Sequence, residues 1–219
     1  MSFEILTMTS CRWSIRAMVA LGEKPAGYRL VDVSQNGRKA PWYDALTPFG
    51  KTPALRHADR IVVESRVINE YIEEVAPGRK LLPRDPLERA WARIWNAYCD
   101  EELMRYLQVA AAGKPAARRR AHEDFRAALE RLDAHVFYYA QPGAFWGGPQ
   151  PSLTDICYWS LFDVLERTEQ LQAARRLLDG HPRLGAWSRQ LLAYPAFAEA
   201  SALLEALPAP TPPDSSPGR

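Results

Sequence analysis

The sequence predicts two domains in series, an α/β domain first and an all-α domain after it. Short apolar runs of strand length alternate with helical spacing up to residue 76, whereas the pattern from residue 87 onward is almost entirely helical. Between them, prolines and a glycine cluster with charged residues, which is typical of a linker. We therefore expect domains at residues 1–76 and 87–207, a linker at 77–86, and a disordered tail at 208–219 that has nothing to bury.

The first domain is expected to contain a β-α-β unit followed by a β-hairpin and a helix. A right-handed crossover should join its first two strands, because parallel strands are connected in that hand. The expected elements are strands at 3–8, 28–33, from 53 and at 61–63, helices at 14–21, 42–46 and from 65, and a polar loop at 34–40. This order resembles the thioredoxin-like fold.

The second domain is expected to consist of helices at 87–111, 115–139, 152–168, 170–179, 182–192 and 195–206. Glycines and prolines at 147–151 interrupt the helical pattern once. Ser152 and Asp155 follow with the spacing of a capping box at the start of a strongly apolar helix. We therefore predict a structural role for Asp155.

Composition indicates an ordinary globular protein: 219 residues, 47% hydrophobic and 25% charged, suffice for one large core or two small ones. The formal net charge of +2 is small, and the arginines at 118–120 neighbour Glu123 and Asp124, which argues against nucleic-acid binding. No apolar stretch reaches membrane length, and residues 1–5 carry no leader pattern. We expect a cytoplasmic protein with neither nucleic acid nor membrane as partner.

The three cysteines, Cys11, Cys99 and Cys157, have no CxxC or zinc-like spacing. The sequence therefore predicts neither a disulfide scaffold nor a metal site, and Cys99 and Cys157, in apolar helical stretches, are expected to be small buried side chains. Cys11 differs because it lies where the first strand gives way to the first helix. Free N–H groups and the helix dipole favour a nucleophilic thiolate there.

Residues 47–65 predict a binding site for a small anionic peptide. Thr52 precedes Pro53, so this bond is a candidate for the cis isomer, which would leave the Thr52 backbone unpaired and able to hold a peptide. Glu64 and Ser65 fall at the start of the next helix, where Ser65 can act as cap and a carboxylate is attracted.

The strings TPFGKTPAL and ESRVINEYIEE resemble the glutathione-site signature of glutathione transferases. Residues 77–90 and 144–166 are similar to the omega class in particular. The resemblance implies that Cys11 meets the glutathione sulfur. It also implies that Thr52 with Pro53 holds the cysteinyl backbone, that Glu64 with Ser65 holds the γ-glutamyl group, and that Lys39, with Arg38 as a substitute, pairs with the glycyl carboxylate.

The first turn departs from the omega pattern, which has Cys-Pro-aromatic where this chain has Cys11, Arg12 and Trp13. The turn also resembles serine-type members of the family, so Ser10 is a second candidate as hydroxyl donor to the glutathione thiolate. Ser14 is expected to be an ordinary helix cap. For the second substrate we expect aromatic contacts, from Trp13, Trp95 and Tyr98.

The function expected is that of a homodimeric, omega-like glutathione transferase that uses Cys11 for thiol transfer or reductive deglutathionylation. Its ligands would be glutathione and a small electrophilic or disulfide substrate, without a metal. Two alternatives stay open: conjugation of electrophiles by a glutathione thiolate that Ser10 or the helix start activates, and a non-catalytic binding module of the same fold.

Overall fold

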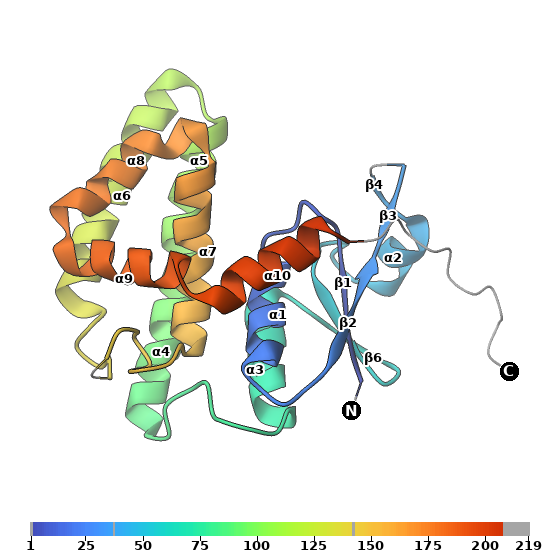
Figure 1. The fold of residues 1–219 in the computed structure, drawn as a ribbon. Helices are drawn as coiled ribbons and strands as arrows, with labels where there is room; N and C mark the ends of the chain where they lie inside the picture. Colours follow the sequence, from blue (N-terminus) through green and yellow to red (C-terminus); the bar gives the residue numbers. More distant parts are fainter. Residues whose placement is uncertain (1, 37, 142, 208–219) are drawn as a thin grey trace, which may run out of the picture. The chain divides into compact units, whose positions relative to one another are not determined.

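The computed structural model describes residues 2–36, 38–141 and 143–207 (Figure 1). These group into two compact units, one formed by the described residues up to 79 together with 198–207, the other by Lys80–Phe197. The division falls inside the predicted linker, although the last residues group with the first unit. The exact domain boundaries predicted from the sequence stay a prediction. The predicted tail at 208–219 lies outside the described residues.

The first unit is built on a four-stranded sheet with strand order β2-β1-β5-β6. Its elements are β1 (Phe3–Thr7), α1 (Ser14–Gly22), β2 (Tyr28–Asp32), β3 (Ser34–Gln35), β4 (Arg38–Lys39), α2 (Pro41–Leu46), β5 (Ala54–His57), β6 (Arg60–Val63) and α3 (Ser65–Val75). Strand β1 pairs in parallel with β2 and antiparallel with β5, with Leu6 opposite both Val31 and Ala54. The predicted β-α-β unit, hairpin and helix are confirmed, and this is the thioredoxin-like arrangement.

Both sides of the central strand are covered. Helices α1 and α3 pack against each other and against strands of the sheet (Figure 1). A separate apolar cluster joins Leu6, Val33 and Ala54 to the buried ring of Tyr43 on α2. The loop expected at 34–40 contains the short β3-β4 ladder instead, because Asp32 accepts hydrogen bonds from Ser34 and fixes a turn there.

The second unit is helical, as predicted. Its elements are α4 (Pro86–Tyr98), a π-helix (Cys99–Leu103), α5 (Met104–Ala112), α6 (Pro115–His135), α7 (Leu153–Arg167), a 3-10 turn (Glu169–Leu171), α8 (Gln172–Arg176), a second 3-10 turn (Leu177–Gly180), α9 (Pro182–Leu192) and the start of α10 (Pro195–Glu205). The single helix expected at 87–111 is therefore interrupted by a π-turn, which the spacing of apolar residues does not reveal.

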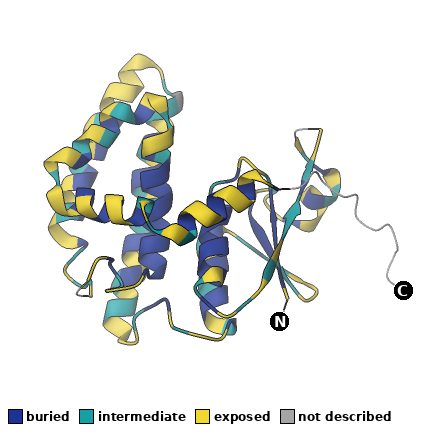
Figure 2. Ribbon diagram, viewed as in Figure 1, coloured by how far each residue is buried: buried dark blue, intermediate teal, exposed yellow. Residues whose placement is uncertain are grey.

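Helix α7 is the core of this unit. Figure 2 shows it buried along most of its length, whereas α6 presents an exposed side. The predicted capping box is confirmed, since the Ser152 hydroxyl accepts from the Asp155 amide and Asp155 accepts from the Ser152 amide. Among the helices of the described residues, none combines the length and apolar composition needed to cross a bilayer.

Candidate active site

Cys11 lies in a tight turn between β1 and α1. Its amide donates to the carbonyl of Met8 at 2.9 Å, and its own carbonyl accepts from the amide of Ser14 at 3.1 Å. Only 8% of the residue is exposed. The turn therefore fixes the backbone of Cys11 and leaves its side chain close to the start of α1.

The two serines beside Cys11 differ. Ser10 is exposed, and its hydroxyl makes no hydrogen bond with any other described residue. Ser14 was expected to cap α1, but this is wrong: Trp13 holds the N-cap position, and Ser14 is already helical. The buried Ser14 hydroxyl instead lies 2.5 Å from that of Thr7, because the end of β1 offers it a partner.

The Tyr43 side chain, on α2, bonds to the segment before Pro53. Its hydroxyl donates to the carbonyl of Lys51 at 2.6 Å. Burial raises the pKa of Tyr43 well above its ordinary value, and charge on Cys11 raises it further. Tyr43 was not among the site residues predicted from the sequence, since an aromatic residue in a short helix gives no signal of its contact with Lys51.

The Thr52–Pro53 bond is cis, the isomer for which the sequence made it a candidate. Pro53 is buried and Thr52 is half-buried. Neither the N–H nor the C=O of Thr52 has a hydrogen-bond partner in the described part of the chain. The bend thus leaves one extended residue whose backbone donor and acceptor are available to an incoming peptide.

Glu64 has an unusual backbone conformation where β6 meets α3. Its φ is +68°, a region that residues other than glycine seldom adopt, and such outliers cluster at ligand sites. Glu64 is exposed and holds the N-cap position of α3 without capping through its side chain. Ser65 was expected to cap this helix, but it is the first helical residue, so this interpretation is wrong.

Ser65 faces a cation instead. The buried guanidinium of Arg16, on α1, donates to the Ser65 hydroxyl at 3.4 Å. This contact brings a positive charge to the N-terminus of α3, where the first N–H groups of a helix favour an anion. The start of α3 is therefore suited to a carboxylate, with Glu64 positioned to meet an ammonium group.

The Lys39 side chain, on β4, contacts the loop that precedes Thr52. Its ammonium donates to the carbonyl of Gly50 and lies 4.0 Å from a carboxylate oxygen of Asp44. Arg38, the substitute considered from the sequence, is exposed. Lys39 thus contacts the residue two positions before Thr52, and another carboxylate could replace Asp44 beside its ammonium.

Arg12 joins the turn to the C-terminal part of the first unit. Its guanidinium donates to the Ser201 hydroxyl at 3.0 Å and lies 3.6 Å from a carboxylate oxygen of Glu205. The sequence analysis did not find this link, since 189 residues separate Arg12 from Ser201. The residue next to Cys11 is therefore held by α10.

The aromatic residues predicted for a second substrate lie in different units. Trp13 is half-buried in the first unit. Trp95 and Tyr98 belong to α4, where their rings make an edge contact at 5.6 Å and the Tyr98 hydroxyl donates to the carbonyl of Ala128. Their contacts within the helical unit are core packing, and a role in substrate binding stays a prediction.

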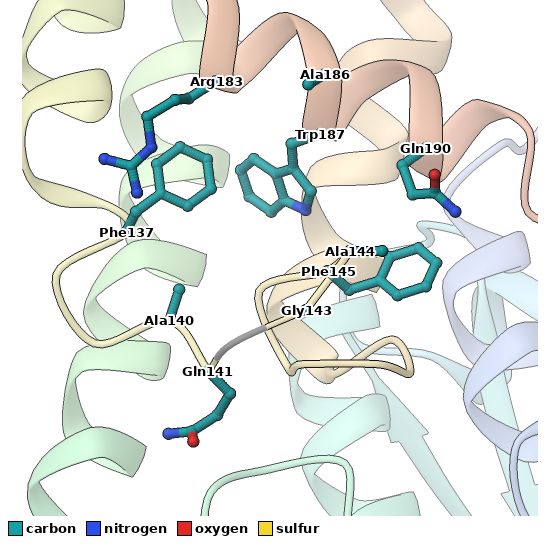
Figure 3. Close-up of a pocket in the computed structure, with 10 residues that line it drawn as sticks. All are labelled: Phe137, Ala140, Gln141, Gly143, Ala144, Phe145, Arg183, Ala186, Trp187 and Gln190. Carbon is teal, nitrogen blue, oxygen red and sulfur yellow. The ribbon is translucent and has the colours of Figure 1, made fainter.

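The helical unit also contains an open cavity of about 500 Å³. Figure 3 shows the rings of Phe137, Phe145 and Trp187 around it, and the Arg183 guanidinium lies 4.3 Å from the centre of the Phe137 ring. None of the site residues predicted from the sequence lines this cavity. All of its lining residues belong to the helical unit.

The first unit combines a thioredoxin-like sheet with a cysteine turn and a cis-proline bend, and a helical unit follows it in the chain. This is the architecture of a two-domain enzyme that acts on a thiol-containing peptide. Family models agree: the model for the glutathione S-transferase N-terminal domain matches residues 10–75, and that for the C-terminal domain matches residues 115–190. The chain belongs to the glutathione transferase family.

Individual relatives come from more than one class. The chain is 35% identical over 198 residues to the probable glutathione S-transferase BZ2 of Zea mays, with 84% of each covered. It is 29% identical over 168 residues to glutathione S-transferase omega-2 of Rattus norvegicus, which covers 74% of this chain and 65% of that one. A tau-class glutathione S-transferase structure from Mangifera indica matches with a TM-score of 0.74 and 26% identity, covering 93% of this chain and 96% of that one. Similarity to the omega class is thus present, alongside similarity to plant enzymes.

Proposed function

We propose that this glutathione transferase catalyses glutathione-dependent thiol transfer, or reductive deglutathionylation, with Cys11 as the nucleophile. The observation that carries the proposal is the pairing of β1 with β5, with Leu6 opposite Ala54, because it places the Cys11 turn after β1 and the cis Thr52–Pro53 bond before β5 at the same edge of the sheet. A peptide thiol held along the Thr52 backbone would therefore have its sulfur near Cys11. A thiolate at that position is a competent nucleophile for disulfide exchange.

The reaction would proceed in two exchanges. The Cys11 thiolate attacks the glutathionyl sulfur of a mixed disulfide, a new S–S bond forms, and the other thiol leaves as a thiolate that takes a proton from solvent. The thiolate of a second glutathione then attacks the Cys11–glutathione disulfide. Glutathione disulfide leaves and the Cys11 thiolate is restored, so no electron acceptor besides the substrate disulfide is needed.

Binding of glutathione is assigned to three groups of this unit. Thr52, which precedes the bend at Pro53, would pair with the backbone of the cysteinyl residue through its N–H and C=O, which have no partner in the described chain. Glu64 would accept from the γ-glutamyl ammonium, and Ser65 with the start of α3 would bind its carboxylate, supported by the charge of Arg16. Lys39 would exchange its contact with Asp44 for the glycyl carboxylate.

A second candidate function is glutathione conjugation with Ser10 as the hydroxyl that donates to the glutathione thiolate. Two observations favour it. Ser10 is exposed with an unpartnered hydroxyl in the described chain, whereas Cys11 is only 8% exposed. The chain is also similar to the tau-class glutathione S-transferase of Mangifera indica. In this reaction the glutathione thiolate itself attacks an electrophile, and Cys11 forms no bond.

Three further expectations concern the oligomeric state, the cellular location and the second substrate. We propose a homodimer, as the resemblance of the sequence to glutathione transferases implies. We also propose a cytoplasmic location and a small electrophilic or disulfide second substrate. Light scattering of the purified protein would test the dimer, and a monomer at all concentrations would contradict it.

The decisive experiment compares wild type, Cys11→Ala and Ser10→Ala in glutathione-dependent reduction of hydroxyethyl disulfide, with the intact mass of each recorded. Thiol transfer predicts activity and a glutathione adduct in the wild type and in Ser10→Ala. Both should be lost in Cys11→Ala, by about 100-fold or more for a removed nucleophile.

The opposite pattern would support conjugation. If Cys11→Ala keeps its rate of conjugation with an aromatic electrophile while Ser10→Ala loses most of it, the thiol-transfer proposal is wrong. Calorimetric titration with glutathione separates these cases from a failure to bind, because Thr52, Glu64 and Ser65 are unchanged in both variants.

A further inference from the structure

A cluster of metal-ligating side chains lies inside the helical unit. The cluster consists of Cys99 and Asp100, from the π-helix, and Cys157, from α7. One donor atom from each lies within 4.8 Å of the other two. The sequence predicted no metal site because no two cysteines have ligand spacing, but the fold brings together residues that are 58 positions apart.

Contacts that hold the two thiols are long. The sulfur of Cys157 lies 3.7 Å from the backbone carbonyl oxygen of Asn96 and 3.8 Å from a carboxylate oxygen of Asp100, and that of Cys99 lies 3.9 Å from the backbone carbonyl oxygen of Cys157. Both cysteines are buried, at 0% and 4% exposure, whereas Asp100 is half-buried. The cluster is therefore closed on the thiol side and accessible on the carboxylate side.

The π-helix explains how two adjacent residues face one partner. Successive side chains of an α-helix point about 100° apart, so neighbours seldom share a target. The π-helix at Cys99–Leu103 has more residues per turn, so the angle between neighbouring side chains is smaller. Both Cys99 and Asp100 therefore approach Cys157 on α7. Single π-turns within α-helices are rare and occur frequently at functional sites.

Unpartnered polar atoms on the same helix faces provide a second, independent observation. Asn96 precedes Cys99 and Asp100 by three and four residues, and Thr154 precedes Cys157 by three, so each shares a face with the cluster. The side-chain oxygens of Asn96 and Thr154 are buried without a hydrogen-bond partner in the described chain. Buried polar atoms are nearly always satisfied, so these two indicate a missing ligand.

We propose that Cys99, Asp100 and Cys157 bind a thiophilic divalent cation of the zinc class, with the side-chain amide oxygen of Asn96 as the fourth ligand. Thiolate sulfurs select such ions over magnesium and calcium, which require oxygen ligands. On binding, each thiol releases a proton to solvent and forms a sulfur–metal bond, while the ionised carboxylate forms an oxygen–metal bond. No electrons are transferred.

The geometry and the charge both permit this ion. Zinc–sulfur bonds of about 2.3 Å place tetrahedral ligands roughly 3.8 Å apart, so the donors need to move inward by about 1 Å at most. Two thiolates and a carboxylate leave a net charge of about −1 around a divalent ion.

The test uses the full chain with Cys11→Ser as background, so that the only thiols are those of the cluster. After chelator treatment under a phosphine reductant, cadmium is added and the thiolate-to-metal charge-transfer absorption is followed, and zinc is counted by native mass spectrometry. We expect one ion per chain with either metal. Introducing Cys157→Ser should abolish the charge-transfer band at the same cadmium concentration.

Asp100→Asn provides a second variant, because a half-buried position tolerates substitution better than the buried thiol. It should weaken zinc binding by about 10-fold or more, whereas Glu101→Gln, an exposed neighbour on the same π-helix, should not change it. Circular dichroism of each variant confirms that it is folded. Absence of binding in the background protein, or equal affinity in Asp100→Asn and Glu101→Gln, would overturn the proposal.

Discussion

The two units bury charged groups in different ways. In the first, the ammonium of Lys24 lies 2.8 Å from a carboxylate oxygen of Glu73, and these side chains are 0% and 8% exposed. In the second, Asp155 is fully buried and accepts five hydrogen bonds of 2.7–3.0 Å from N–H and O–H donors. One unit neutralises a buried charge with an opposite charge, and the other surrounds it with dipoles.

This difference shows what each buried group contributes. The Lys24–Glu73 pair joins the end of α1 to α3, so it fixes two elements that are distant in the sequence. Asp155 instead gathers the loop before its own helix, through Trp146 and Ser152, and reaches α9 through the indole of Trp187. Burial raises the pKa of Asp155, and the hydrogen bonds oppose that rise. Its removal should therefore leave several donors unsatisfied at once.

The largest effect is expected for Asp155→Ala. The substitution leaves the amides of Trp146 and Ser152 and the indole N–H of Trp187 buried without an acceptor. Each unsatisfied donor costs about 1–3 kcal/mol, so the free energy of unfolding should fall by about 4 kcal/mol or more. Urea unfolding followed by far-ultraviolet circular dichroism, which reports the helices, measures this loss.

Glu166→Gln is the matched control, because this exposed carboxylate lies on the same helix and pairs with Arg175 at the surface. It should change the free energy of unfolding by less than about 1 kcal/mol. Equal losses for Asp155→Ala and the control would show that the network around Asp155 does not stabilise the unit.

A smaller effect is expected for Lys24→Met in the first unit. It leaves the Glu73 carboxylate buried without this cation, and it deprives the carbonyl of Arg79 of a donor. Breaking a buried pair costs about 3 kcal/mol, whereas replacing both partners by apolar residues is often close to neutral. The double variant Lys24→Met, Glu73→Leu should therefore recover much of the lost stability.

A double-mutant cycle in urea, completed with Glu73→Leu alone, measures the coupling. Losses that simply add would mean that the two buried charges do not interact, and the contrast drawn with Asp155 would then be wrong.

The same contrast explains what could be predicted from the sequence. Asp155 was assigned correctly because its capping box spans four consecutive residues, and the cis candidate at Thr52–Pro53 also depends on two neighbours. Helical and strand periods likewise predicted most elements, since each is a local property. The prediction that Ser14 caps α1 failed, because its hydroxyl has a hydrogen-bond partner in Thr7, which lies outside the local sequence pattern.

Other parts of the site depend on contacts between distant residues. Nothing near Tyr43 in the sequence reports that its hydroxyl reaches Lys51, or that Arg12 is held by Glu205. The approach of Cys99 to Cys157 requires both the π-turn and the packing of two helices. These features follow from tertiary structure, so spacing in the chain contains no signal for them.

The smallest effect is expected for Glu4→Gln, which tests an ion pair at the surface of the sheet. Glu4 contacts the guanidinium groups of Arg29 and Arg56, which are 69% and 36% exposed. Burial raises the pKa of Glu4, but the hydrogen bonds and charges of both arginines outweigh burial and lower it below 4.5. Solvent screens such pairs, so the loss in free energy of unfolding should stay below about 1 kcal/mol near neutral pH.

The sign of the pH dependence follows from that lowered pKa. Because the carboxylate is favoured in the folded protein, its contribution is present above pH 4.5 and is lost as the pH falls through the folded pKa. Wild type and Glu4→Gln should therefore differ in urea midpoint near neutral pH and converge in acid. A difference that persists or grows in acid would mean that Glu4 acts through packing, and then even this exposed pair would resemble the buried one at Lys24 more than a screened surface contact.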